Sequence, residues 1–138
     1  MTIMEHTSKI TVRYYETDQM GVVHHSNYIR YFETAREEMM QHYGIPYSET
    51  ESRGIIMPVH AVHCDYIRPA RYGEVLSVVT RLEEMPRSRI TFRYQICNPS
   101  GILLAKGYVT LAFVDVSRGV PVRAPGFLTE VLEKYLNL

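Results

Sequence analysis

The sequence has 138 residues, of which 46% are hydrophobic and 22% are charged. This length and composition predict one globular domain, residues 1–138, that buries about two thirds of the surface its unfolded chain exposes. Its 15 basic and 15 acidic side chains give a formal net charge of zero. That balance excludes a global field that would recruit nucleic acid or an anionic membrane.

Cysteine content and hydropathy indicate the cellular compartment in which the protein is expected. The two cysteines, Cys64 and Cys97, are too few for a disulfide framework and do not form a Cys-x-x-Cys pair for zinc or redox chemistry. The first ten residues contain a histidine and a glutamate where a signal peptide needs an apolar core. No apolar run approaches the length of about 18 residues that a membrane span needs. We therefore expect a soluble, cytoplasmic protein.

The first part of the chain predicts a strand followed by a long helix. Residues 9–15 alternate apolar and polar side chains, as a half-buried strand does. From residue 28 the apolar spacing becomes helical, and the residues of this face are Tyr28, Tyr31, Phe32, Ala35, Met39 and Tyr43. We expect Ser26 or Asn27 to cap this helix, and Gly44 with Pro46 to end it.

The rest of the chain predicts mainly strands, after a connection with a short helical turn near residues 48–53. Four strands and a terminal helix are expected at residues 58–68, 74–85, 87–97, 102–116 and 127–136. The strand at 87–97 alternates most regularly, which predicts a sheet with one buried face. The strand at 102–116 is apolar on both sides and is therefore expected inside the sheet.

The order strand, long helix, four strands, short helix predicts an α+β fold. One long helix lying against one strongly curved antiparallel sheet would bury the apolar faces of both. The segments 59–68 and 74–85 could pair locally, so periodicity alone leaves the strand order open.

Chemistry is most strongly indicated in the stretch YYETDQMGVVHHSNY, residues 14–28, just before the helix. A carboxylate upstream of a helix N-terminus stays ionised beside the positive end of the peptide dipoles. Asp18 is therefore a candidate nucleophile or general base, although a simple turn aspartate is the structural alternative. Gly21 permits a sharp turn, and free N–H groups near residues 24–28 could bind an oxygen that becomes negative.

Three neighbouring side chains have both a chemical and a structural interpretation. His25 could hold the substrate or the attacking water, or it could cap the helix; His24 is the weaker candidate of the two. Tyr14 lies four residues before Asp18 and could bond its carboxylate, or it could be a half-buried strand aromatic. Asn27 is most simply a helix cap.

The sequence lacks the motifs of several other enzyme and metal-binding classes. The sequence contains no phosphate-binding loop, dinucleotide fingerprint, serine-hydrolase elbow or His-Glu-x-x-His zinc motif. His60 and His63 are three residues apart on a predicted strand, so they point to opposite faces and cannot bind one ion together. We expect neither a metal nor a cofactor.

Three segments resemble the hotdog-fold acyl-CoA thioesterases, in the branch of 4-hydroxybenzoyl-CoA thioesterase and the small Tol-Pal-associated thioesterases. The segments are VRYYETDQMGVVHHSNYIRYFETARE, GIIMPVHAVHCDYIRPARYGEVLSV and GYVTLAFVDVSRGVPVRAP. The combination of Thr-Asp-x-x-Gly-Val-Val at residues 17–23 with the Asn-Tyr and Phe-Glu pairs behind it is specific. The resemblance covers nearly the whole chain.

The resemblance implies a hotdog fold, in which a curved five-stranded antiparallel sheet wraps one long helix and a short C-terminal helix follows. It also implies that Asp18 is the catalytic carboxylate, that the helix N-terminus polarises a thioester carbonyl, and that Tyr14 and His25 line the site. Relatives often have tyrosine at position 24, where this chain has His24. The expected contribution there is a backbone N–H, so the chemistry is retained while the fit to the acyl group changes.

The implied substrate is an acyl-CoA, with an acyl-carrier-protein thioester as a second option. His24, Ser26, Asn27 and Tyr28 are the expected substrate-binding residues at the helix start. Arg87 and Arg89 are candidates for the CoA phosphates, with Arg68 and Arg71 as alternatives; all four residues are arginines at predicted turns or strand ends.

The family further implies that an edge strand, the one after the helix, pairs with its copy. The expected assembly is therefore a homodimer or a homotetramer with sites at the dimer interface. Two other functions stay open: a non-catalytic hotdog module that senses or binds acyl-CoA, and a hotdog dehydratase.

Overall fold

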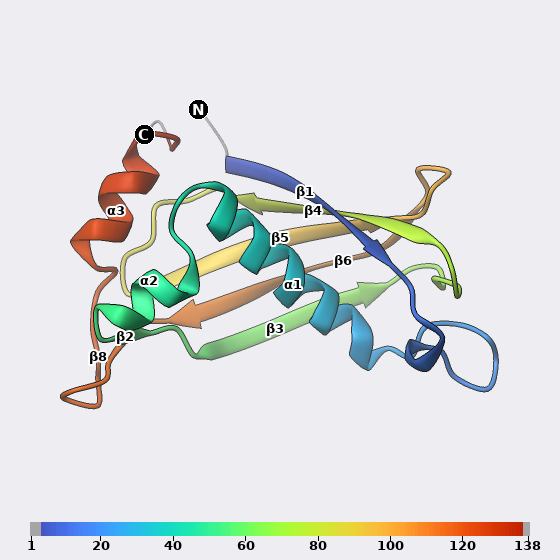
Figure 1. Ribbon diagram of the computed structural model, residues 1–138, viewed down its shortest axis with the longest axis horizontal. Helices are drawn as coiled ribbons and strands as arrows, with labels where there is room; N and C mark the ends of the chain where they lie inside the picture. The colour runs from blue at the N-terminus through green and yellow to red at the C-terminus, as the bar shows by residue number, and fades with distance from the viewer. Residues whose placement is uncertain (1–3, 137–138) are drawn as a thin grey trace.

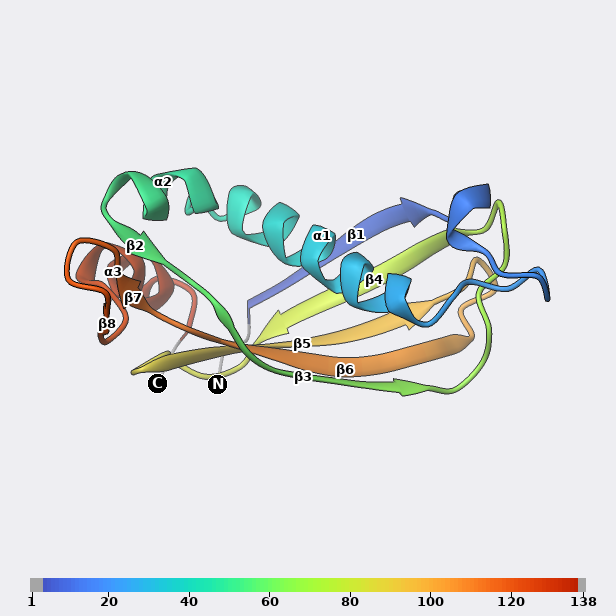
Figure 2. The ribbon, with the colours of Figure 1, turned by 90° about the horizontal axis from the view of Figure 1, so that it is seen from below.

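The computed structural model describes residues 4–136, in which one long helix crosses one face of an antiparallel sheet (Figures 1 and 2). The helix is α1, Ser26–His42. The main sheet has five strands in the order β1-β4-β5-β6-β3. These strands are β1 Met4–Thr11, β3 Val59–Tyr66, β4 Val75–Leu82, β5 Arg89–Cys97 and β6 Leu103–Ala112. The predicted α+β hotdog fold is confirmed.

The strand order settles the pairing that periodicity left open. β3 does not pair with β4, the next strand along the chain; it pairs with β6, and β4 lies between β1 and β5. β6 is interior, as its two apolar sides predicted, since β5 and β3 flank it. Within the described residues, β1 and β3 are the edges of the main sheet.

Short elements lie at both ends of the sheet. η1 Tyr14–Glu16 lies where β1 ends, beside the start of α1 (Figure 1). The others lie at the opposite end, and they are α2 Tyr47–Ser52, β2 Ile55–Ile56, β7 Val114–Asp115, β8 Val120–Pro121 and α3 Gly126–Glu133. β2, β7 and β8 form a small three-stranded sheet that the sequence did not predict. α2 and α3 confirm the expected short helices to within a few residues. None of the helices in residues 4–136 has the length and apolar content needed to cross a membrane.

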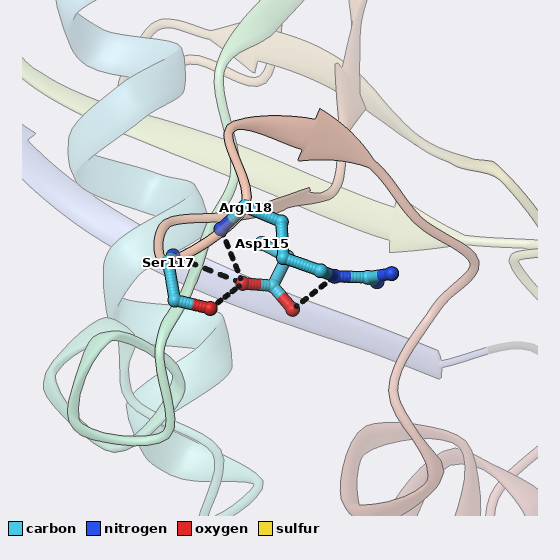
Figure 3. Close-up of polar contacts among 3 residues, drawn as sticks. All are labelled: Asp115, Ser117 and Arg118. Atoms are coloured by element: carbon cyan, nitrogen blue, oxygen red, sulfur yellow. Dashed lines mark hydrogen bonds and ion pairs between the residues drawn. The ribbon is translucent and has the colours of Figure 1, made fainter.

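A self-contained turn joins β7 to β8 (Figure 3). The carboxylate of Asp115 accepts from the N–H of Ser117 at 2.9 Å and from its hydroxyl at 2.7 Å. The same carboxylate accepts from the N–H and Nε of Arg118, both at 3.2 Å. The Ser117 hydroxyl, followed by the other donors, lowers the pKa of Asp115. The aspartate thus holds the turn through donors close in the sequence.

The core lies between α1 and the inner face of the sheet. On α1, the predicted face is buried from Tyr28 to Met39, and Phe32 stacks on Tyr94 of β5 with ring centroids 4.3 Å apart. The alternating inner residues of β5 are no more than 2% exposed. Periodicity therefore identified both faces that make this contact.

The predicted extent of the first strand is wrong. The first strand ends at Thr11 and does not continue to Tyr15, because the chain leaves the sheet after Val12, whose N–H bonds Glu74 O at 2.9 Å. The turn η1 follows, so Tyr14 is not a strand residue. Arg36 was not predicted to be buried, yet it is only 4% exposed.

The histidine of β1 gives the fold a predicted pH dependence. His6 lies beside His42, with ring centroids 4.9 Å apart. Burial, then the charge of His42, lowers the pKa of His6 below 6.5, while Glu38 opposes the shift. The unfolded chain therefore binds this proton more readily than the folded protein does. The stability that His6 contributes above pH 6.5 is lost as the pH falls from 6.5 through the lower pKa of the folded state.

We expect urea unfolding to give a smaller free energy at about pH 5.5 than at about pH 7.5, and His6→Gln to reduce this difference. His60→Gln, at an exposed position of β3, is the matched control. An equal pH difference in wild type and His6→Gln would contradict this assignment.

Candidate active site at the start of α1

The loop that carries Asp18 is closed by its own backbone. The N–H of Asp18 donates to Val22 O at 2.8 Å, and the N–H of Gly21 donates to Asp18 O at 3.0 Å. Gly21 has φ +77°, a left-handed conformation that glycine adopts without strain. Asp18 Oδ1 accepts from the N–H of Met20 at 2.8 Å. The turn fixes the main chain at Asp18 just before the helix and leaves the residue exposed.

Glu16 ties this loop to the first turns of α1. Its carbonyl oxygen accepts from the N–H of His24 at 2.9 Å and from Asn27 Nδ2 at 2.9 Å. Its carboxylate Oε1 accepts from the Tyr31 hydroxyl at 2.9 Å and from the N–H of Arg13 at 2.7 Å. Burial, then the bond to Glu16, raises the pKa of Tyr31, so the hydroxyl remains a donor. We call these four hydrogen bonds the Glu16 clamp.

The start of α1 differs from the expected capping. Neither Ser26 nor Asn27 caps the helix: the cap position is His25, without a side-chain capping bond. Asn27 Nδ2 reaches back to Glu16 O instead. The Nδ1 of His24 accepts from the N–H of Ser26 at 3.2 Å and lies 2.8 Å from its Oγ. The capping prediction fails because the Asn27 side chain bonds Glu16 of the loop and the Ser26 side chain bonds His24.

The unbonded N–H at the helix start is that of His25. The N–H of His24, expected to face the substrate, already donates to Glu16 O. Asn27 and Tyr28 donate to the carbonyls of His24 and His25 at 3.0 and 3.3 Å. Within residues 4–136, the N–H of His25 has no acceptor. It is thus the donor that the fold leaves available for a ligand oxygen at the positive end of α1.

An open pocket of about 260 Å³ lies beside this helix start, between α1 and the end of β3. Its lining residues are Val23, His25, Tyr28, Tyr66, Ile67, Arg68 and Pro69. The Tyr66 hydroxyl donates to His25 O at 3.2 Å, and the Tyr28 and Tyr66 rings meet edge to face at 5.1 Å. Tyr28 is buried, and its hydroxyl accepts from the N–H of Ala70 at 3.1 Å. His25 and Tyr28 are therefore brought together, whereas Asp18 does not line this pocket.

Sequence reasoning missed Tyr66, Glu16 and Tyr31. Alternation along β3 places Tyr66 on the same face as Cys64 and Val62. This alternation could have been used to predict that the Tyr66 side chain points towards the helix. The bond between Glu16 and Tyr31 joins residues 15 apart and has no sequence pattern.

Tyr14 lies on the same loop in a different environment from the one expected. It is 75% exposed, and its ring meets Tyr72 edge to face at 5.6 Å. The hydrogen bond that Asp18 Oδ1 accepts comes from the N–H of Met20 and not from the Tyr14 hydroxyl.

The candidate arginines separate into two groups. Arg68 and Arg71 lie at the Asp18 end of the sheet: Arg68 lines the pocket, and Arg71 forms a β-bridge with Val22. Arg87 and Arg89 lie at the opposite end, because β4 runs antiparallel to β1 and carries the chain away from the Asp18 loop (Figure 1). One chain alone therefore does not bring Arg87 and Arg89 to this site.

The sheet order, the long helix on its inner face and the acidic loop at the helix start define a hotdog fold of the thioesterase type. Residues 12–134 match the family model described as thioesterase-like superfamily. The chain belongs to this superfamily and to its acyl-CoA thioesterase branch.

Known relatives agree with this family across most of the chain. The sequence is 37% identical over 120 residues to a putative acyl-CoA thioesterase of Bacillus subtilis, YneP, covering 86% of this chain and 87% of the relative. A DHNA-CoA thioesterase from Staphylococcus aureus superposes with a TM-score of 0.88 at 32% identity, covering 94% of this chain and 89% of that one. A 4-hydroxybenzoyl-CoA thioesterase shares the fold, with a TM-score of 0.82 at 21% identity over 93% of this chain and 98% of that one.

Proposed function

We propose that this protein hydrolyses acyl-CoA thioesters to the free acid and CoA, and that Asp18 and the start of α1 form the reaction site. The observation that carries the proposal is the Glu16 clamp, which holds the Asp18 loop against the helix start where the N–H of His25 is free. The similarity to named acyl-CoA thioesterases supports the same substrate class.

The chemistry follows from these two groups. A thioester oxygen that accepts from the N–H of His25 becomes more negative as the carbonyl carbon is attacked, and the donor and the helix dipole stabilise that charge. The Asp18 carboxylate either attacks the carbon, giving an acyl anhydride that water then hydrolyses, or takes a proton from the attacking water. Both routes expel the CoA thiolate, which gains a proton, and both consume one water.

The substrate contacts differ in kind. His25 and Tyr28 form the wall of the pocket beside the reacting carbonyl, and His24, Ser26 and Asn27 support the helix start that carries the donor. Arg68 and Arg71 lie at the Asp18 end of the sheet, and we assign the CoA phosphates to them. Arg87 and Arg89 contribute only from another subunit. The proposed setting is the cytoplasm, consistent with free thiols at Cys64 and Cys97.

The assembly we propose is a homodimer formed through β3, with a homotetramer as its further association. Among residues 4–136, no strand pairs with the outer side of β3, and such an edge needs cover. Its side chains include exposed apolar residues: Val59 is 54%, Val62 43% and Tyr66 50% exposed. A twofold axis perpendicular to the sheet pairs β3 with its copy antiparallel.

The test is thiol release from acyl-CoAs of graded chain length, aromatic acyl groups included, alongside one acyl-carrier-protein thioester. Turnover of at least one acyl-CoA is expected. Tight acyl-CoA binding without turnover would favour the sensor, and enoyl or hydroxyacyl products would favour the dehydratase; either result would overturn the proposed hydrolysis.

The Glu16 clamp predicts a role for a hydroxyl remote from the reacting atoms. We expect Tyr31→Phe to lower kcat by about tenfold with little change in KM, because a bond to a carboxylate worth about 2 kcal/mol no longer holds the loop. Tyr43→Phe is the matched control, since it removes a hydroxyl bonded to Glu5 O, at 2.9 Å, near the other end of α1. Equal kcat in Tyr31→Phe and wild type would show that the clamp does not position the loop.

A further inference from the structure

The end of β3 lies beside the start of α1 (Figures 1 and 2). Tyr66 is the last residue of this strand, and its hydroxyl donates to His25 O at 3.2 Å. Among residues 4–136, no other side chain bonds the backbone of His25. The Tyr66 hydroxyl therefore connects the sheet to the residue whose N–H is free for a ligand.

The main chain that carries Tyr66 is held by the neighbouring strand. Tyr66 pairs with Ala105 of β6. The N–H groups of the next two residues, Ile67 and Arg68, both donate to Leu104 O, at 2.8 and 3.0 Å. The phenol thus projects from a part of the sheet that is bonded at consecutive residues.

The ring and hydroxyl of Tyr66 are held as well, although the residue is 50% exposed. The ring meets Tyr28 edge to face with centroids 5.1 Å apart, and it meets His25 in the same way at 6.2 Å. Burial, then the charge of Cys64, raises the pKa of Tyr66, so the hydroxyl keeps its proton. These contacts leave the hydroxyl a donor that is directed towards the helix start.

His25 occupies the cap position of α1 without the usual capping bond. Its φ of −55° and ψ of −29° are helical, whereas cap residues are normally extended and accept through their side chain. The carbonyls on both sides are held instead. His24 O accepts from the N–H of Asn27 at 3.0 Å, and His25 O accepts from the N–H of Tyr28 at 3.3 Å and from the Tyr66 hydroxyl. Of these three bonds, the one from Tyr66 comes from outside the helix.

The direction of the His25 N–H depends on these restraints. This N–H belongs to the planar peptide group that also contains His24 O, and rotation about the backbone bonds of His25 turns that group. A donor stabilises developing charge when it points at the position that the negative oxygen will occupy. Losing the outside restraint would therefore weaken transition-state stabilisation more than substrate binding.

We propose that Tyr66 is a positioning residue: its hydroxyl holds the backbone of His25 so that the free N–H points at the thioester oxygen. The inference rests on the proposed function, in which that N–H is the oxyanion donor. Tyr66 acts through His25 and takes no part in bond making or breaking. Its ring has a separate role, as a wall of the pocket beside the helix start.

Steady-state kinetics separate the hydroxyl from the ring. Tyr66→Phe keeps the ring, and we expect kcat for acyl-CoA hydrolysis to fall about fivefold with KM within about twofold, as for one neutral hydrogen bond that acts in the transition state. Tyr66→Ala also removes the pocket wall, so KM should rise too. Tyr108→Phe on β6 is the matched control. Tyr108 stacks on His63 at 5.5 Å, its hydroxyl forms no hydrogen bond in the described part of the chain, and kcat should stay at the wild-type value.

The carbonyl of a bound thioester reports on the donor directly. A hydrogen bond to a carbonyl oxygen weakens the C=O bond and lowers its stretching frequency. An acyl-CoA with an isotope label at the thioester carbon is bound to Asp18→Asn, which should turn it over very slowly, and to Asp18→Asn/Tyr66→Phe. We expect infrared difference spectra to show a higher carbonyl frequency in the double variant. Asp18→Asn/Tyr108→Phe should match Asp18→Asn. A tyrosine that only stabilised the fold would leave the frequency unchanged.

The outcomes separate this inference from the proposed function. Equal kcat in Tyr66→Phe and wild type would overturn the role of Tyr66, and so would a reduced kcat with an unchanged carbonyl frequency; neither result would affect the role of Asp18. A wild-type protein that releases no thiol from any acyl-CoA, or Asp18→Asn with wild-type turnover, would instead overturn the proposed function, and this inference with it.

Discussion

Asp18→Asn is expected to lower kcat for acyl-CoA hydrolysis by about a thousandfold, because a neutral amide can neither attack the thioester carbon nor take a proton from water. The substitution keeps an oxygen that can accept from the N–H of Met20, so the turn should persist. The free energy of unfolding should therefore change little, which is checked by urea unfolding alongside thiol release.

A neighbour on the same loop supplies the control. Gln19 is exposed, and Gln19→Ala should keep wild-type kcat within about twofold, as expected for a surface substitution. If Asp18→Asn retained wild-type turnover, the role given to this carboxylate would be wrong, whatever the fold and family.

Gly107→Ala should destabilise the protein by about 3 kcal/mol or more. A Cβ at Gly107 would lie 2.0 Å from His63 O and 3.0 Å from Cys64 Cα. These are backbone atoms of β3, which cannot rotate away as a side chain would. β3 must therefore separate from β6, and this also disturbs the edge through which we propose the dimer forms.

Urea unfolding measures this loss, and light scattering at several protein concentrations measures the assembly. Gly126→Ala is the matched control, because a Cβ at the start of α3 meets nothing within 4 Å and alanine favours helix. It should leave stability equal or slightly higher. A Gly107→Ala protein that unfolds within about 0.5 kcal/mol of wild type would contradict the close approach of β3 to β6.

Periodicity predicted the elements that bury one regular face. α1 and β5 were predicted with nearly their observed bounds because each has one apolar face, and these faces pack together at Phe32 and Tyr94. The strand order was not predictable in this way, since β1–β4 and β3–β6 pair across long stretches of chain. Arg36 was missed for a related reason: the hydroxyls that satisfy it come from α2 and β5.

The candidate site was predicted in part. Asp18 and His25 lie where a carboxylate loop meets a helix start, as their spacing indicated. The clamp between Glu16 and Tyr31 was not predictable, because it depends on how η1 lies against α1. The antiparallel pairing of β1 with β4 decides which arginines lie at the Asp18 end of the sheet, and that pairing is not a property of the local sequence.

The central claim is that the thioester carbonyl binds at the start of α1, between the N–H of His25 and the side chain at position 18. The most direct measurement is a crystal structure of Asp18→Asn with a bound acyl-CoA. We predict a carbonyl oxygen about 3 Å from the His25 nitrogen, with the carbonyl carbon within about 3.5 Å of the Asn side chain. A thioester held elsewhere, with the N–H of His25 facing solvent, would contradict the account.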